Sequence, residues 1–193
     1  DFCLSRGLGD VYKRQVITPY QDDRSLRSEM ARNTFTELDK IQILLNVAEA
    51  LSLAHEQNVI HRDVRPENIF IQSDRRAALA NFGLAYNEAH DDASFNVTVD
   101  LEDFDLNAYT SEDVFIGDYS AASDVYSFGV LAYELMTGQK FPFDNFKELL
   151  MKGGKLPKDS LPSAVNSNVE KWVDELCERT IVVDPIERWA NID

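Results

Sequence analysis

Hydrophobic positions recur at helical spacing in two long segments of the chain. Thr36 and Asp39 form a capping-box pattern, and apolar residues follow every three or four positions as far as His55. Apolar residues also fill most positions between Ser123, a candidate helix cap, and Gly138, a typical helix stop. We predict an amphipathic helix over the first segment. The second should be a buried central helix, because it is apolar around most of its circumference.

Shorter elements are predicted around these two helices. Runs of β-branched and aromatic residues predict short strands at 16–20, 59–60, 69–71 and 77–80. Asn58 suits the left-handed conformation that ends a helix. Two short helices are expected at 146–152, ended by Gly153 and Gly154, and at 169–177. The predicted fold class is therefore mainly α with a few short β-strands.

The composition of the chain limits the kinds of binding partner and the location that can be expected for it. A chain of 193 residues with 44% hydrophobic residues can bury one sizeable core. No apolar run approaches the roughly 18 residues of a membrane span, so we expect no membrane contact from this segment. The net charge of −15 argues against nucleic acid, because phosphate binding needs clustered Lys and Arg. With only Cys3 and Cys177, a disulfide framework is not expected, and a reducing, cytoplasmic location is the default.

The string His61 to Asn68, HRDVRPEN, carries the candidate chemistry. Phosphoryl transfer needs an acceptor for the hydroxyl proton, a cation beside the transferred phosphate, and a metal ligand close together. Asp63, Arg65 and Asn68 can supply all three from one loop. The string resembles the catalytic loop of protein kinases, and its Arg-Pro-Glu-Asn ending is similar to the serine/threonine type.

Three further motifs agree with this resemblance in order and spacing. Asn81-Phe82-Gly83 lies 18 positions after Asp63, where protein kinases have Asp-Phe-Gly. Residues 123–129 resemble the start of the family's central helix, and 184–188 resemble its late Arg-containing segment. The resemblance covers residues 16–193 and implies a partial kinase domain: the last strand of the N-terminal lobe, the hinge and most of the C-terminal lobe. The complete domain would be α+β.

Residues 1–15 are predicted to be a non-native leader. Residues 5–15, SRGLGDVYKRQ, resemble a translated adaptor sequence of the kind found in environmental assemblies. Gly7 and Gly9 look like a shortened glycine-rich phosphate loop, but they lie only 54 positions before His61. That is too little chain for the strands and helix of an N-terminal lobe, so we reject this motif as a phosphate loop.

The resemblance implies a role for each matching residue. Asp63 would be the catalytic base, Arg65 would replace the family's Lys as the cation facing the phosphate, and Asn68 would hold the second metal ion. The ATP-binding set implied by the family is Tyr20, Gln21, Arg65, Asn68, Phe70 and Asn81, with Asn68 and Asn81 at the metal. The structural and regulatory set is His61, Arg62, Phe82, Gly83, Glu112, Asp113, Asp124 and Arg188.

Within that second set, specific contacts are expected. His61 and Phe82 would belong to the internal spine, and Asp124 would anchor the backbone of the catalytic loop. Arg188 would pair with an acidic residue, and the sequence leaves open whether this is Glu112 or Asp113.

Position 81 departs from the family pattern. Mg²⁺ prefers anionic oxygen, and an amide offers one neutral oxygen. We expect a weakened Mg²⁺ site and a loss of transition-state stabilisation on the order of 10²-fold. A misread codon and an active kinase that tolerates Asn are the alternatives.

The activation segment departs as well. The Pro of the family's closing motif is missing beside Glu112, and the Thr that normally bridges base and Lys is absent near 105–106. Ten carboxylates crowd 88–118, an interval without Lys or Arg. They form either a solvated acidic loop or carboxylate partners for Arg62, which in the family receives a phosphate.

Two candidate functions follow from these sequence features. The first is a kinase that transfers phosphate from ATP to protein Ser or Thr hydroxyls in the full-length protein. The alternative is a pseudokinase that binds and regulates a protein partner, with weak or no catalysis because of Asn81. The segment alone is expected to be inactive, because half of the nucleotide cleft lies in the N-terminal lobe.

Overall fold

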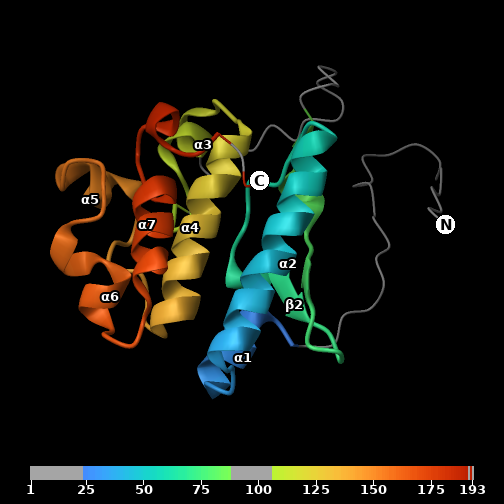
Figure 1. The fold of residues 1–193 in the computed structure, drawn as a ribbon. Coiled ribbons are helices and arrows are strands. Elements are labelled where there is room, and N and C mark those ends of the chain that lie inside the picture. Colours follow the sequence, from blue (N-terminus) through green and yellow to red (C-terminus); the bar gives the residue numbers. More distant parts are fainter. Residues whose placement is uncertain (1–23, 88–105, 191, 193) are drawn as a thin grey trace, which may run out of the picture.

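The computed structural model describes residues 24–87, 106–190 and 192. Two long helices, α2 (Glu37–Glu56) and α4 (Ala121–Thr137), pack together, and α7 (Lys171–Thr180) packs against α4 as well (Figure 1). The shorter helices are α1 (Leu26–Arg32), α3 (Glu112–Ile116), α5 (Phe146–Met151) and α6 (Pro162–Val165). Four 3₁₀ turns complete the helical elements: η1 (Pro66–Asn68), η2 (Phe82–Leu84), η3 (Lys158–Ser160) and η4 (Pro185–Glu187). The prediction of a mainly helical fold with a few short strands is confirmed.

Helix α4 is the centre of the core. Every residue from Ala122 to Thr137 is buried, as its nearly continuous apolar pattern predicts. The predicted cap was wrong by one turn: Ser120 caps the helix, and Ser123 occupies the third position of the capping box. Ser120 and Ser123 are both residues of the kind that caps helices, so the local sequence does not distinguish them. The reciprocal hydrogen bonds of the capping box show which of the two is the cap. Gly138 ends the helix in the left-handed conformation, with φ 70°, as predicted.

The other helix signals also correspond to observed ends. Thr36 and Asp39 form both hydrogen bonds of a capping box at the start of α2, and Asn58 follows its end with φ 57°. Helix α5 stops one residue earlier than predicted, before Gly153 and Gly154, which both have positive φ. Helix α7 is displaced by two to three residues from the predicted 169–177. The sequence pattern therefore located these helices, and their ends differ from the predicted ones by one to three residues.

Two antiparallel strand pairs, of which only β2–β3 is a hairpin, position the candidate site. β1 (Val59–Ile60) pairs with β4 (Tyr86–Asn87), and β2 (Ile69–Ile71) pairs with β3 (Ala77–Leu79) in the register Ile69–Leu79 and Ile71–Ala77. The predicted strands at 59–60, 69–71 and 77–80 are confirmed, the last one residue shorter. β4 was not predicted, and the strand expected at 16–20 lies outside the described residues. Because the pairs join β1 to β4 and β2 to β3, segment 61–68 must face segment 80–85.

Within the described ranges, none of the helices has the length and apolar character needed to span a membrane.

Candidate active site

The loop between β1 and β2 is joined to the segment between β3 and β4 by hydrogen bonds at both ends. The Ala80 amide donates to the Asn68 carbonyl at 2.9 Å, and His61 Nε2 lies 2.9 Å from the Ala80 carbonyl oxygen. His61 is fully buried, so its ring anchors the loop and is not available to a substrate. The two motifs of the sequence therefore form one rigid unit.

Asp124 holds the start of this loop from the first turn of α4. Its carboxylate accepts the backbone N–H groups of His61 and Arg62, each at 2.8 Å, and lies 2.9 Å from His55 Nε2. Asp124 is completely buried, so these hydrogen bonds replace its lost hydration. Arg62 has φ 67°, a conformation that a non-glycine residue adopts only where its surroundings enforce it. Asp124 therefore has the geometry of an anchor for the loop backbone.

The three residues expected to carry the chemistry lie together. The Asn68 side-chain amide donates to Asp63 Oδ2 at 2.6 Å and to the Asp63 carbonyl at 2.8 Å. Arg65 Nε lies 3.9 Å from Asp63 Oδ1. The side chains of Asp63 and Arg65 are 22% and 29% exposed, so both remain accessible to a bound molecule. The arrangement offers an oriented carboxylate beside a guanidinium, which suits proton acceptance next to an anionic group.

Asn81 approaches the same cluster from the facing segment. Its Nδ2 donates to Asn68 Oδ1 at 3.1 Å, and its backbone is left-handed with φ 64°. Asn68 and Asn81 thus bring two oxygen-bearing side chains together, the atom type that Mg²⁺ requires. Both are neutral, and among the described residues no group of three His, Cys, Asp or Glu side chains could hold a metal ion. The amide oxygens of Asn68 and Asn81 are ligand atoms of the type that Mg²⁺ binds. Because neither carries a negative charge, they fit only a weakened Mg²⁺ site.

The remaining predicted nucleotide-site residues are placed in part. Phe82 meets His61 edge-on at 4.6 Å between ring centroids and is 45% exposed, so one face of the ring is open. Gly83 follows it, and a Cβ at that position would lie 3.5 Å from Asn81 Oδ1, an ordinary contact. Phe70 lies in β2 and is half-buried beside Ser25. Tyr20 and Gln21 lie outside the described residues.

Arg62 is surrounded by groups that the sequence did not indicate. Its Nε donates to the Leu84 carbonyl, and its guanidinium lies 4.4 Å from the ring centroid of Tyr119 and 5.8 Å from that of Tyr86. Burial lowers the pKa of Arg62 below the ordinary arginine value. Residues 88–105 lie outside the described part of the chain, so their proposed pairing with Arg62 stays a hypothesis.

Arg188 pairs with Asp113, an alternative that the sequence left open. Its Nη2 lies 2.8 Å from Asp113 Oδ1, and both side chains are buried. The same guanidinium donates to three carbonyl groups, those of Ala122, Val182 and Val183. Neighbouring residues on a helix point in different directions, so only one acidic residue of α3 can face Arg188. Glu112 instead lines a hollow on the surface.

Sequence reasoning missed Arg27 of α1. Arg27 donates to Glu67 at 2.7 Å, to Glu134 at 2.8 Å and to the Tyr109 hydroxyl at 3.0 Å. Burial lowers its pKa, but the hydrogen bonds to the carboxylates of Glu67 and Glu134 outweigh this and raise the pKa above the ordinary arginine value. These residues line a hollow of about 460 Å³ that also includes Arg65. No local pattern marks contacts separated by up to 107 positions, so the tertiary fold was needed to find them.

Both a family model and individual known proteins match this chain. The family model described as protein tyrosine and serine/threonine kinase matches residues 6–188. The chain is 37% identical over 153 residues to the serine/threonine-protein kinase PknL of Mycobacterium tuberculosis, an alignment that covers 78% of this chain. It is 28% identical over 182 residues, 91% of this chain, to the probable serine/threonine-protein kinase PknB of Lactococcus lactis.

The chain is short relative to these proteins. It spans 37% of the length of PknL and 28% of the length of the Lactococcus PknB. The family match includes residues 6–15, and the predicted boundary of a leader at residue 15 stays a prediction.

Proposed function

Since this chain belongs to the protein tyrosine and serine/threonine kinase family, we propose that the full-length protein transfers the terminal phosphate of ATP to Ser or Thr hydroxyls of a protein substrate. The observation that carries this proposal is the Asp63 carboxylate, oriented by Asn68 at 2.6 Å and accompanied by Arg65. The serine/threonine-protein kinases among its relatives support the choice of hydroxyl.

In the proposed reaction, Asp63 accepts a hydrogen bond from the substrate hydroxyl and takes its proton as the oxygen attacks the terminal phosphorus. The bond from that phosphorus to the bridging oxygen breaks, and ADP leaves with the electron pair. Asn68 keeps the carboxylate turned toward the hydroxyl through its amide hydrogen bond. Arg65 lies close enough to compensate the negative charge of the transferred group, with the fork geometry of a guanidinium in place of an ammonium.

Asn68 and Asn81 would hold Mg²⁺ together with the phosphates of ATP. When bound, the ion would neutralise charge on the phosphate oxygens. Phe70 would lie under the adenine, and Tyr20 and Gln21 would hydrogen-bond to its edge. The substrate segment would approach through the hollow that joins Arg65 to the network around Arg27 and Glu67.

We assign the reaction to the cytoplasm. Cys177 is fully buried as a free thiol, and burial raises its pKa, which keeps the sulfur protonated and unreactive. The low cysteine count, with two cysteines in 193 residues, favours a reducing compartment, and the buried free thiol is compatible with it.

A pseudokinase is the second candidate, and one hydrogen bond favours it. Asn81 donates to the very oxygen of Asn68 that would face a metal ion. An Asp at position 81 would be ionised and could not donate in this way. A bound ion must therefore displace this hydrogen bond without gaining an anionic ligand. If the binding of Mg²⁺ does not compensate for the loss of this hydrogen bond, the same fold would bind and regulate a protein partner without catalysis.

The substitution Asp63→Asn in the full-length protein tests the proposed activity. It removes the proton acceptor with little change in shape, and we expect phosphate transfer from Mg-ATP to fall by about 10²–10⁴-fold. Asp74→Asn, a partly exposed carboxylate paired with Arg76, is the matched control and should leave the rate unchanged. Equal rates in wild type and Asp63→Asn would refute the proposed reaction. An inactive wild type would favour the pseudokinase.

A further inference from the structure

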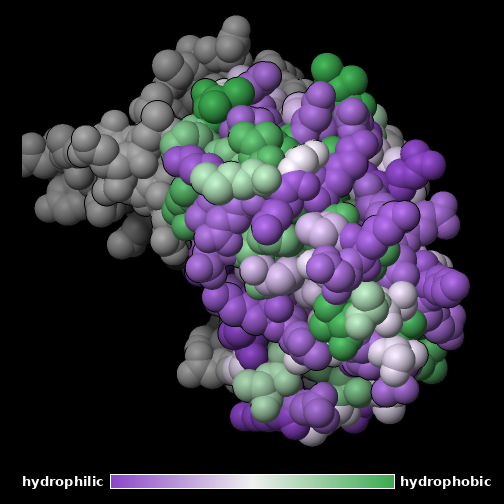
Figure 2. Space-filling model, turned by 90° about the vertical axis from the view of Figure 1, so that its left-hand side faces the viewer, coloured by the Kyte–Doolittle hydropathy of each residue, from purple (hydrophilic) through white to green (hydrophobic). Residues whose placement is uncertain are grey.

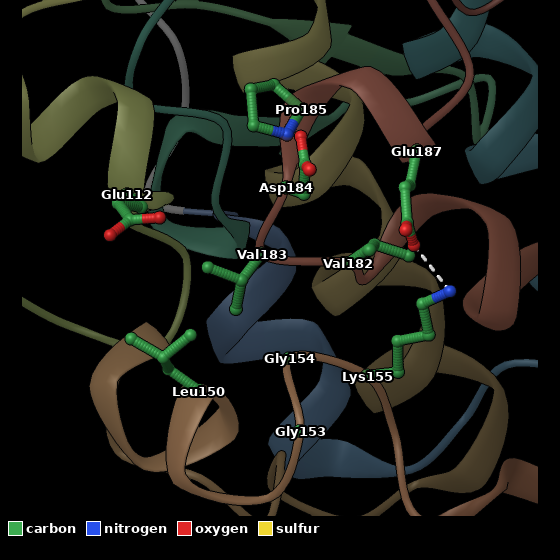
Figure 3. A pocket seen from close by; sticks show the side chains of 10 residues that line it. All are labelled: Glu112, Leu150, Gly153, Gly154, Lys155, Val182, Val183, Asp184, Pro185 and Glu187. Carbon is green, nitrogen blue, oxygen red and sulfur yellow. Dashed lines mark ion pairs between the residues drawn. The ribbon is translucent and has the colours of Figure 1, made fainter.

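A second hollow lies away from the candidate active site. It has a volume of about 340 Å³ and lies between α3, α5 and the segment around η4. Figure 3 shows Glu112 and Leu150 on one side, Lys155 and Glu187 on the other, and Val183 between them. None of these residues takes part in the chemistry proposed above.

Part of the lining of this hollow is apolar. Val182 and Val183 form part of the lining and are buried within the fold, whereas Leu150 at the edge is 50% exposed. Large apolar side chains grouped around a concavity mark a contact surface more strongly than isolated ones do. Figure 2 shows the face that lies at the left of Figure 1, where green patches interrupt the purple surface.

The charges of the lining indicate the sign of an occupant. Among the described residues that line the hollow, Glu112, Asp184 and Glu187 carry carboxylates and Lys155 is the single cation. Lys155 is already ion-paired with Glu187. Within the described ranges, the Asp184 carboxylate accepts a hydrogen bond only from the Ile186 amide, and the Glu112 carboxylate has no ion pair. The chain as a whole carries a charge of −15, which further disfavours an acidic partner.

We propose that this hollow docks a segment of a partner protein that carries aliphatic side chains flanked by Lys or Arg. An aliphatic side chain would lie against Leu150 and Val183, and the basic groups would pair with Glu112 and Asp184. Apolar contact would supply affinity, and the unpaired carboxylates would select the basic flanks. Docking at this surface does not require catalysis, so it applies equally to a kinase and to a pseudokinase.

The test uses the full-length protein and a fluorescein-labelled peptide of repeated Lys-Leu-Leu-Arg units, with binding followed by anisotropy. Leu150→Ser should weaken binding about tenfold, the effect of losing one apolar anchor. Leu45→Ser on α2 is the matched control, because Leu45 is 51% exposed and does not line the hollow. Peptides with Glu for the basic residues, or with Ser for Leu, should bind at least tenfold more weakly than the parent peptide.

A charge-reversal pair provides an independent readout. Glu112→Lys should weaken peptide binding, whereas Glu49→Lys on the exposed face of α2 makes the same change in net charge away from the hollow. Equal loss in both variants would show that the peptide responds only to total charge, and it would overturn the proposal. Equal binding by Leu150→Ser and Leu45→Ser would also overturn it. A much larger loss of thermal stability in Leu150→Ser than in Leu45→Ser would show that the protein's own chain covers the hollow, with the same consequence.

Discussion

Asn81 is the residue on which the strength of the proposed catalysis depends. Its amide donates to Asn68 Oδ1, so the departure from the family pattern both removes a negative charge and adds a competing hydrogen bond. Asn68 cannot use the same oxygen fully for a metal ion while that bond persists. The family motif alone indicates the first effect, and the structure adds the second.

Restoring the carboxylate should therefore raise activity. We expect Asn81→Asp in the full-length protein to increase phosphate transfer on the order of 10²-fold at limiting Mg²⁺, because the carboxylate binds the ion and frees Asn68. The Mg²⁺ concentration for half-maximal rate should fall as well. Asn58→Asp, at an exposed position between α2 and β1, is the control and should change neither quantity. Equal rates for wild type and Asn81→Asp would show that position 81 does not limit the metal site.

At the level of the helices, one small residue sets how closely α4 and α7 pack. Gly129 lies in the middle of α4, and a Cβ at this position would lie 2.7 Å from Thr180 Cβ and 2.8 Å from Ile181 Cγ1. Both of those residues are fully buried. Glycine is unfavourable inside a helix, so its presence here reflects the contact between α4 and the end of α7.

Gly129→Ala should consequently destabilise the protein although alanine favours helices. Because the added Cβ would lie closer than 3.0 Å to three atoms, the clash should cost about 2–3 kcal/mol, the upper part of the range for overpacking, against an intrinsic helix gain of about 1 kcal/mol. We expect a net decrease in the free energy of unfolding of about 1–2 kcal/mol, measured by urea denaturation. Gly83→Ala, where a Cβ would make only an ordinary contact, should change stability by less than about 0.5 kcal/mol. An unchanged or raised stability of Gly129→Ala would contradict the close packing of α4 and α7.

Across the whole molecule, Arg188 ties together segments that lie far apart in the chain. It pairs with Asp113 of α3 and donates to carbonyl groups in the first turn of α4 and after the end of α7. Ion pairs of this kind become important when both members are buried, because removing one leaves a charge without compensation. The pair thus links the end of the activation segment to the helical core.

Arg188→Ala should cost about 3–5 kcal/mol of stability, the range for breaking a buried pair. The loss should appear as a lower midpoint in thermal and urea denaturation of the full-length protein. Arg179→Ala removes a guanidinium from an exposed position of α7 and serves as the control, with an expected change below about 0.5 kcal/mol. If the two variants proved equally stable, Asp113 would not depend on Arg188.

Much of this architecture follows from local sequence. The capping box at Thr36, the continuous apolar pattern of α4 and the stop at Gly138 predicted the two main helices, because caps and periodicity act within a few residues. The string from His61 to Asn68 was equally readable, since the chemistry proposed for it depends on side chains two and five positions apart. The conformation that brings Asp63, Arg65 and Asn68 together also depends on distant anchors, because Asp124 and Ala80 hold the backbone of the loop.

Other features depended on contacts between distant segments. The choice of Asp113 over Glu112, the tyrosine rings around Arg62 and the network of Arg27 all join residues with no local relation. The hollow beside Leu150 likewise exists only where α3, α5 and η4 converge. Local order thus determined which elements form and which groups could act on a phosphate. Tertiary packing determined which carboxylates are paired and which remain free, because pairing depends on distance in space and not along the chain.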